Sequence, residues 1–258
     1  MSKLLRADFY RMYCNKRIWL CVASMILAAI FFILMQYGGM DYTVPFSRVI
    51  FLPMTFYGIV IAALVSLFVG EDFSDGVIRN KIVAGRKRSS IYLSNMICIW
   101  SACLMVYILT ILTTVAIGIS LFENNVTLTE FFTFFGLGLF TSIAFGSVFC
   151  ILSMLIGNKS TSAMVCMGLA FGMLFLCLHT NQILVQQEYK DGVLNPHYVG
   201  GMKRILYELV HDINPFGQVA QLSDMSCLNW VRWIGIDIFW MIDAICLGNI
   251  LFNKKDIR

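Results

Sequence analysis

The sequence predicts an all-α, polytopic integral membrane protein, and three observations lead to that prediction. Apolar residues make up 59% of the 258 residues and charged residues 13%, against roughly 45–50% and about 25% in soluble domains. Six long runs carry few charges, and most basic residues lie in the segments that join these runs on one side. This composition excludes a soluble domain, a disordered chain and a disulfide-rich secreted scaffold.

Six apolar runs are long enough for a helix to cross a bilayer, which takes about 20 residues. The first is too long for a signal peptide, although Lys16 and Arg17 precede it. The second carries Pro53 in its first turn, where a missing amide hydrogen matters least. The third exceeds the required length by about ten residues, which predicts a tilt or a projecting end. No run alternates as a barrel strand would. We therefore expect a single transmembrane domain over 1–258, with spans at 18–37, 49–69, 91–120, 131–156, 161–178 and 231–252.

The distribution of lysine and arginine predicts the orientation. Fourteen of the 19 lie in the N-terminal segment, between the second and third runs, between the fourth and fifth, or after the sixth. The positive-inside rule therefore places both termini in the cytoplasm of a multi-pass cell-membrane protein. These basic residues occupy short loops beside the membrane. We therefore interpret them as a signal of membrane topology and not as a nucleic-acid-binding surface.

Two segments outside the spans have helical patterns. In 1–17, Leu5, Phe9 and Met12 recur at helical spacing among basic residues, which predicts an amphipathic elbow helix at the inner interface. An ordinary basic flank of the first span is the alternative. The segment 181–229 is too long to be featureless. Apolar residues from Ile205 to Ile213 predict a short helix in this extracellular or partly re-entrant segment.

Catalytic and cofactor-binding motifs are missing. Gly157–Ser160 lacks the Gly-Lys pair and the upstream glycine of a phosphate-binding loop. The nine cysteines form no CxxC pair. His179, His197 and His211 show no metal-ligand spacing, so solvated or interfacial histidines are favoured over a metal site. We predict no enzyme activity, no metal and no cofactor bound by this chain.

The segment 71–90 is polar and longer than a tight turn. Acidic residues stand at its start, basic residues at its end, and Gly85 follows its last apolar residues. This order predicts a short cytosolic helix whose charges complement its dipole. A solvated loop that merely follows the positive-inside rule is the alternative.

The same segment resembles the cytosolic loop of ABC-2 type permeases, the membrane subunits of one class of ATP-binding-cassette exporter. Glu71, Gly76 and Arg79 match the E-x(4)-G-x-x-[RK] pattern, and the basic turn 85–88 follows. The elbow segment, the outer segment with its Asn-Pro-Phe at 214–216, and the closing 251–256 agree in order with that family.

The resemblance implies a permease subunit that pairs with a second, identical or related, permease subunit and with two cytosolic ATPase subunits, which bind the ATP. It also implies export, with peptide-antibiotic export or self-immunity as the process served. The loop would act as a coupling helix seated on the ATPase. The implied interface residues are Glu71, Asp72, Phe73, Asp75, Gly76, Ile78, Arg79 and Lys81.

Two acids lie within the sixth run. Asp237 and Asp243 are separated by about 240° of helix rotation, so they face different sides. Each should face protein or water, because an acid at the bilayer centre is costly. Two interpretations of these acids stay open. One is a polar lining for a substrate pathway or a dimer contact, and the other is a protonated or internally paired acid, for example Asp237 near Arg232. Trp230 and Trp233 are expected at the outer interface.

Two other functions stay open from the residues alone. One is a membrane structural or assembly protein without transport. The other is a secondary transporter, which typically has charged residues or broken helices near the midplane, where only Asp243 lies deep.

Overall fold

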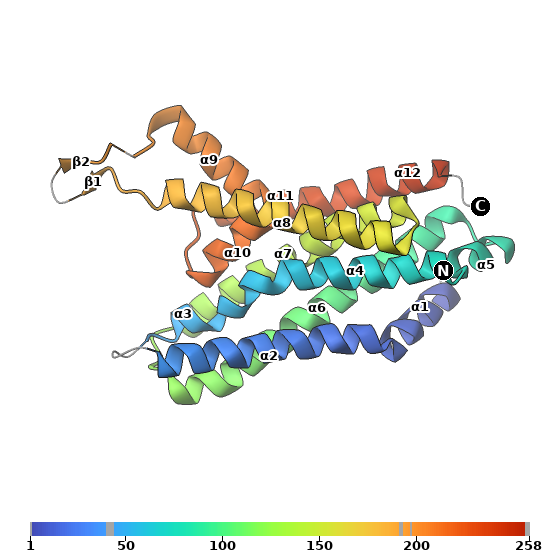
Figure 1. The fold of residues 1–258 in the computed structure, drawn as a ribbon, viewed down its shortest axis with the longest axis horizontal. Coiled ribbons are helices and arrows are strands. Elements are labelled where there is room, and N and C mark those ends of the chain that lie inside the picture. Colours follow the sequence, from blue (N-terminus) through green and yellow to red (C-terminus); the bar gives the residue numbers. More distant parts are fainter. Residues whose placement is uncertain (1, 40–43, 191–192, 197, 256–258) are drawn as a thin grey trace.

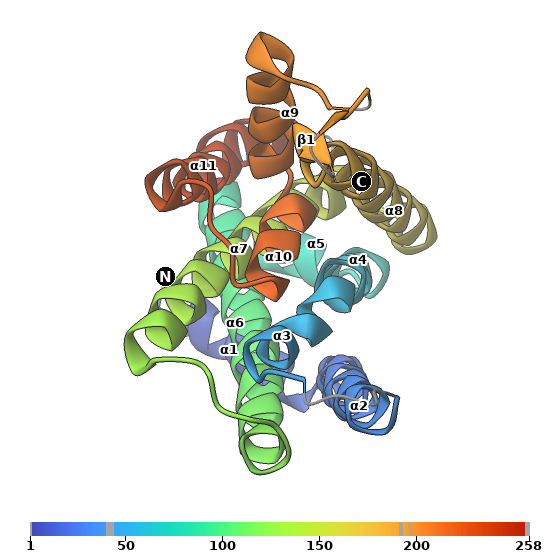
Figure 2. The ribbon, with the colours of Figure 1, turned by 90° about the vertical axis from the view of Figure 1, so that its left-hand side faces the viewer.

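The computed structural model describes residues 2–39, 44–190, 193–196 and 198–255. Within them the fold is all-α apart from a small hairpin, and six helical segments are long and apolar enough to cross a membrane. They run alongside one another in a bundle (Figures 1 and 2). The predicted fold class and the number of spans are therefore confirmed. The segments are Lys16–Gly38, Ser47–Ser74, Arg88–Leu121, Leu128–Ile156, Lys159–Leu184 and Trp230–Lys254.

Each span corresponds to one helix or to a short series of helices. The first, third, fourth and fifth are single helices: α2 (Lys16–Gly38), α6 (Arg88–Leu121), α7 (Leu128–Ile156) and α8 (Lys159–Leu184). The second comprises α3 (Ser47–Ile50), the 3-10 helix η1 (Leu52–Phe56) and α4 (Tyr57–Ser74). Pro53 lies in η1. The sixth comprises α11 (Trp230–Asp243), the π-helical turn η2 (Ala244–Gly248) and α12 (Asn249–Lys254).

Most span ends lie within three residues of the prediction, but the second and fifth spans continue further at their C-terminal ends. The fifth span continues to Leu184 because its polar last residues keep helical hydrogen bonds. The second span begins at Ser47 and ends at Ser74, so it extends beyond the apolar run at both ends. Apolar runs mark the part of a helix that lies in hydrocarbon, and a helix can continue past that part into polar surroundings.

The centre of the bundle lies where α4, α6 and α7 meet. Tyr57 on α4 donates a hydrogen bond from its hydroxyl to the Cys103 carbonyl at 2.8 Å. Its ring packs edge-on against Tyr107 and Phe145. A methyl group at Gly58 would approach the rings of Phe145 and Phe216 to 2.5 Å. The close approach at this point therefore requires glycine.

The segment between the fifth and sixth spans folds back onto the bundle. It contains the antiparallel strands β1 (Tyr189–Lys190) and β2 (Val193–Leu194), then α9 (Gly201–Ile213) and α10 (Pro215–Ser223). The helix expected around 205–213 is present, with Ile205, Leu206 and Leu209 exposed. The helix α10 was not predicted; it is largely buried and lies among α7, α8 and α9 (Figure 2). The segment therefore packs into the bundle at α10.

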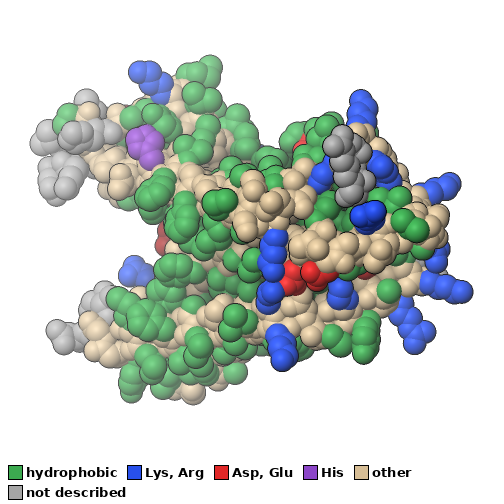
Figure 3. Space-filling view, turned by 45° about the vertical axis from the view of Figure 1, so that its right-hand side comes forward, with side chains coloured by type: hydrophobic (Ala, Val, Ile, Leu, Met, Phe, Trp, Pro, Cys, Tyr) green, Lys and Arg blue, Asp and Glu red, His purple; other side chains and the backbone are tan. Residues whose placement is uncertain are grey.

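Both ends of the described chain lie at one end of the bundle, beside α5 (Val77–Val83) and α1 (Ser2–Cys14) (Figure 1). The hairpin lies at the opposite end. Lys and Arg side chains are numerous at the end that carries the termini (Figure 3). We call it the basic end. The arrangement is that expected of an even number of spans.

Thiol labelling tests the predicted orientation of this bundle. Ser74 and Gln187 are exposed at opposite ends. In a background with the exposed Cys14 and Cys246 and the partly exposed Cys21 and Cys227 replaced by serine, Gln187→Cys should react with a membrane-impermeant reagent added to intact cells. Ser74→Cys should react only after permeabilisation. The reverse pattern would place the basic end outside.

Candidate functional site

The residues predicted for the coupling interface lie at the basic end, on two helices instead of one. Glu71, Asp72 and Phe73 form the last turn of α4, and Asp75 caps it. Gly76 follows with φ +67°, a left-handed conformation that breaks the helix and turns the chain. Ile78, Arg79 and Lys81 lie on α5.

The expectation that Glu71 and its neighbours begin the cytosolic helix is therefore wrong. They end α4, where carboxylates are unfavourable because the C-terminus of a helix carries partial negative charge. Basic side chains from elsewhere in the chain compensate for this. Glu71 pairs with Arg17 and with Lys159, whose Nζ is 3.4 Å from Oε1. Asn15 donates a hydrogen bond from Nδ2 to the other Glu71 oxygen at 3.0 Å.

A second, more deeply buried set of ion pairs lies beside the first. Asp72 pairs with Arg11 of α1, whose guanidinium also stacks 4.6 Å from the centre of the Phe68 ring. Asp8 of α1 accepts hydrogen bonds from Lys81 Nζ and from Ser94 Oγ, both at 2.6 Å. Asp8 and Asp72 are almost completely buried. We call these residues and the partners of Glu71 the ion-pair cluster.

The ion-pair cluster fixes α5 against the bundle. Ile78 is buried, and Lys81 reaches inward to Asp8 on α1. Arg79, Asn80 and Val83 face outward, and Val83 is 80% exposed. The short helix therefore has an anchored inner face and a free outer face. A cavity of about 230 Å³ opens beside it, between α1 and the end of α4.

Sequence reasoning missed the partners of this site. Asp8, Arg11, Arg17 and Lys159 were counted only as part of the charge distribution or not at all. A usable signal existed for Asp8. It is the one acid of 1–17, and it lies four residues from both Leu4 and Met12, the buried positions of α1.

The two acids of the sixth span lie apart. Asp237 is fully buried, whereas Asp243 is partly exposed. The pairing of Asp237 with Arg232 is wrong, because Arg232 pairs with Asp212 of α9. Asp237 Oδ2 is instead 3.4 Å from the Thr141 hydroxyl, and among the described residues its Oδ1 has no hydrogen-bond partner.

Thr141 is the centre of a polar network around Asp237. Its hydroxyl lies 3.0 Å from Gln218 Oε1 of α10, and Trp233 Nε1 donates to it at 2.8 Å. Trp233 is therefore buried inside the bundle, whereas Trp230 is exposed. Gln221 donates to Asp212 at 2.6 Å. The network links α10 to α7 through Gln218 and Thr141, and α11 to α7 through Trp233 and Thr141.

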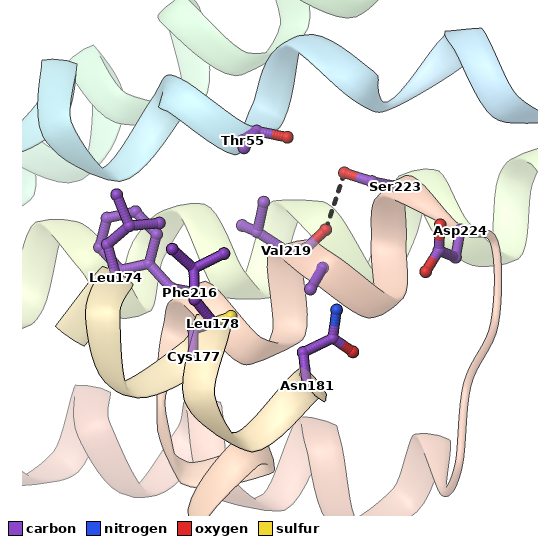
Figure 4. A pocket seen from close by; sticks show the side chains of 10 residues that line it. Thr55, Leu174, Cys177, Leu178, Asn181, Phe216, Val219, Ser223 and Asp224 are labelled. Atoms are coloured by element: carbon purple, nitrogen blue, oxygen red, sulfur yellow. Dashed lines mark hydrogen bonds between the residues drawn. The ribbon is translucent and has the colours of Figure 1, made fainter. Parts of the chain in front are cut away.

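A pocket of about 200 Å³ lies between α8, α10 and η1, in the half of the bundle away from the basic end (Figure 4). Leu174, Leu178 and Val219 line it with apolar surface, and Asn181 and Asp224 supply polar groups. Such a lining suits a small amphipathic group.

The histidines show no metal site in the described part of the chain, where no group of three potential ligands occurs. His197 lies outside the described residues. His211 is buried, contrary to the expectation of solvated or interfacial histidines, and its Nδ1 is 2.9 Å from the Thr180 hydroxyl.

In comparisons with known proteins, no family model matches this chain and no curated protein matches it. The fold and the six apolar helices define the class: a polytopic, multi-span membrane protein.

A double-mutant cycle tests the buried pair of the ion-pair cluster. Asp8→Asn and Lys81→Met should each destabilise the protein by about 3 kcal/mol, since each removes the nearest partner of a buried charge. The double variant should lose less than the sum, by about 1 kcal/mol or more. Unfolding midpoints in detergent measure this. Arg79→Met, on the exposed face of α5, is the control and should change stability by less than about 0.5 kcal/mol. Additive losses would show that the pair does not form.

The buried His211 predicts a loss of stability in acid. Burial lowers its pKa, against the opposing effect of Asp212. The unfolded chain therefore takes up the proton more readily, so stability is complete above about pH 6.5 and falls below it. Unfolding midpoints between neutral and mildly acidic pH should show this fall in the parent and a smaller one in His211→Gln. Parallel profiles would exclude His211 as the cause.

Proposed function

We propose that this chain is the permease subunit of an ABC transporter of the ABC-2 type, driven by separate cytosolic ATPase subunits. The observation that carries the proposal is the attachment of α5. Lys81 joins α5 to α1 through Asp8, and Ser94 joins the same carboxylate to α6. A displacement of α5 would therefore move α1 and the start of α6 with it.

The outer face of α5 is the proposed contact with the ATPase. It consists of Arg79, Asn80 and Val83, which need no partner for folding because they face outward. An exposed apolar side chain flanked by polar ones is typical of a small interface centre. ATP would be bound and hydrolysed by the partner. The permease residues transmit the movement.

A second permease subunit would complete the transporter. The α2, α8 and α11 helices expose much of their apolar surface, whereas α4 and α7 are mostly covered. Lipid or a second subunit can cover such surfaces. Alternating access would arise from rocking of two bundles against each other. The family resemblance favours export as the direction of transport and peptide antibiotics as the substrate class.

Secondary transport is the second candidate function, because Asp237 is a buried carboxyl group with an unpartnered oxygen. Intramembrane acids of this kind often carry protons in transporters. The two functions differ in their energy source. Transport that continues in vesicles with a proton gradient and without the ATPase would favour this second function.

A substitution on the exposed face of α5 tests the ABC proposal. Val83→Asp should leave expression and stability unchanged but weaken association with the partner ATPase by about tenfold or more, because it places a charge in the interface. Co-purification with the candidate ATPase measures this. Val185→Asp is a matched control, since Val185 is 67% exposed at the opposite end. Equal binding by the parent and both variants would exclude α5 as the contact.

A further inference from the structure

One face of α1 combines basic and aromatic side chains that the bundle leaves uncovered. Lys3, Arg6, Tyr10 and Tyr13 follow one another at spacings of three and four residues, so they share one face of the helix. All four are exposed, Tyr10 to 73% and Tyr13 to 55%. We call these four residues the α1 stripe.

The acidic residue of α1 faces away from the stripe. Asp8 lies with Leu4 and Met12 on the buried face and is neutralised by Lys81. Among the described ion pairs, Lys3 and Arg6 have no carboxylate partner. The stripe therefore presents two positive charges to its surroundings. On the expected amphipathic face, Met12 is buried in the core and Phe9 packs against it, while Leu5 is partly exposed.

The stripe lies at the start of the first membrane span. Asn15 separates α1 from α2 and caps α2 by accepting a hydrogen bond from the Arg17 amide at 2.9 Å. Trp19, one turn into α2, is 47% exposed and donates from Nε1 to the Tyr13 carbonyl at 2.8 Å. Tyrosine and tryptophan rings prefer the depth of the lipid headgroups. Tyr10, Tyr13 and Trp19 therefore place Lys3 and Arg6 at that depth.

We propose that the α1 stripe binds the anionic headgroups of phospholipids in the leaflet at the basic end. Basic side chains at this depth attract negatively charged lipid, and each contributes by direct pairing with phosphate. The flanking aromatic rings favour a lipid surface over an acidic protein surface as the partner of the stripe. The reason is that these rings and the start of the first span lie in the same headgroup layer. This interaction goes beyond the proposed transport function and does not require the ATPase.

A local probe on α1 tests the proposal in the full chain. Cys14 is exposed next to Tyr13, and replacing Cys246 and the partly exposed Cys21 and Cys227 by serine removes the other accessible thiols of the described chain. A fluorophore on Cys14 is quenched in phosphatidylcholine vesicles that contain a small fraction of nitroxide-labelled phosphatidylglycerol or nitroxide-labelled phosphatidylcholine. The ratio of the two quenching efficiencies measures local enrichment of the anionic lipid.

The ratio should exceed one in the parent and fall at raised ionic strength. It should fall by up to about fivefold for each charge removed in Lys3→Gln and Arg6→Gln. Lys3→Arg with Arg6→Lys should retain it. Arg86→Gln with Lys87→Gln removes the same charge from an exposed turn at the same end and should leave the ratio unchanged. A parent ratio of one, or an equal fall in this control, would overturn the proposal.

Discussion

Two buried carboxylates, Asp8 and Asp72, set the arrangement of the basic end. A charge removed from water is tolerated only when it is paired and hydrogen-bonded. Each acid takes its cation from another segment: Asp72 from α1 and Asp8 from α5. The position of α1 therefore determines that of α5, and both are fixed relative to α4. Hydrophobic burial alone would let such short helices slide, because it is not directional.

The opposite end of the bundle is held differently. There α10 is buried among three spans, with Phe216 packed 5.1 Å from the ring of Phe145. Its glutamines reach Asp212 and the Thr141 network. Neutral hydrogen bonds and ring packing predominate here, and the ion pairs of the described residues at this end are Asp212–Arg232 and Arg204–Glu208. A movement transmitted from the basic end would reach this end through packed helices.

The spans were predictable because hydrocarbon imposes a length and a composition on any helix that crosses it. The pattern of 71–90 also predicted a short helix, and α5 occupies part of it. The partners could not be predicted in the same way. Lys81 meets Asp8 across 73 positions of sequence, and no local pattern encodes that contact. The burial of Trp233 could not be predicted for the same reason: an indole suits the interface, but here Thr141 offers it a buried acceptor. The segment α10 was missed because its polar glutamines resemble those of a solvated loop.

The π turn in the sixth span has a consequence for how that span is anchored. Its N-terminal half presents Asp237 to Thr141, and its C-terminal half packs Phe252 5.8 Å from the Tyr92 ring. Fifteen residues of uninterrupted α-helix would rotate Phe252 about 60° away from Asp237. The π turn has more residues per turn than an α-helix, so it rotates the chain less per residue. At this turn the Tyr92 hydroxyl donates a hydrogen bond to the Ala244 carbonyl at 2.7 Å. The π turn thus lets the two halves of the sixth span contact different partners: Asp237 meets Thr141, and Phe252 packs against Tyr92.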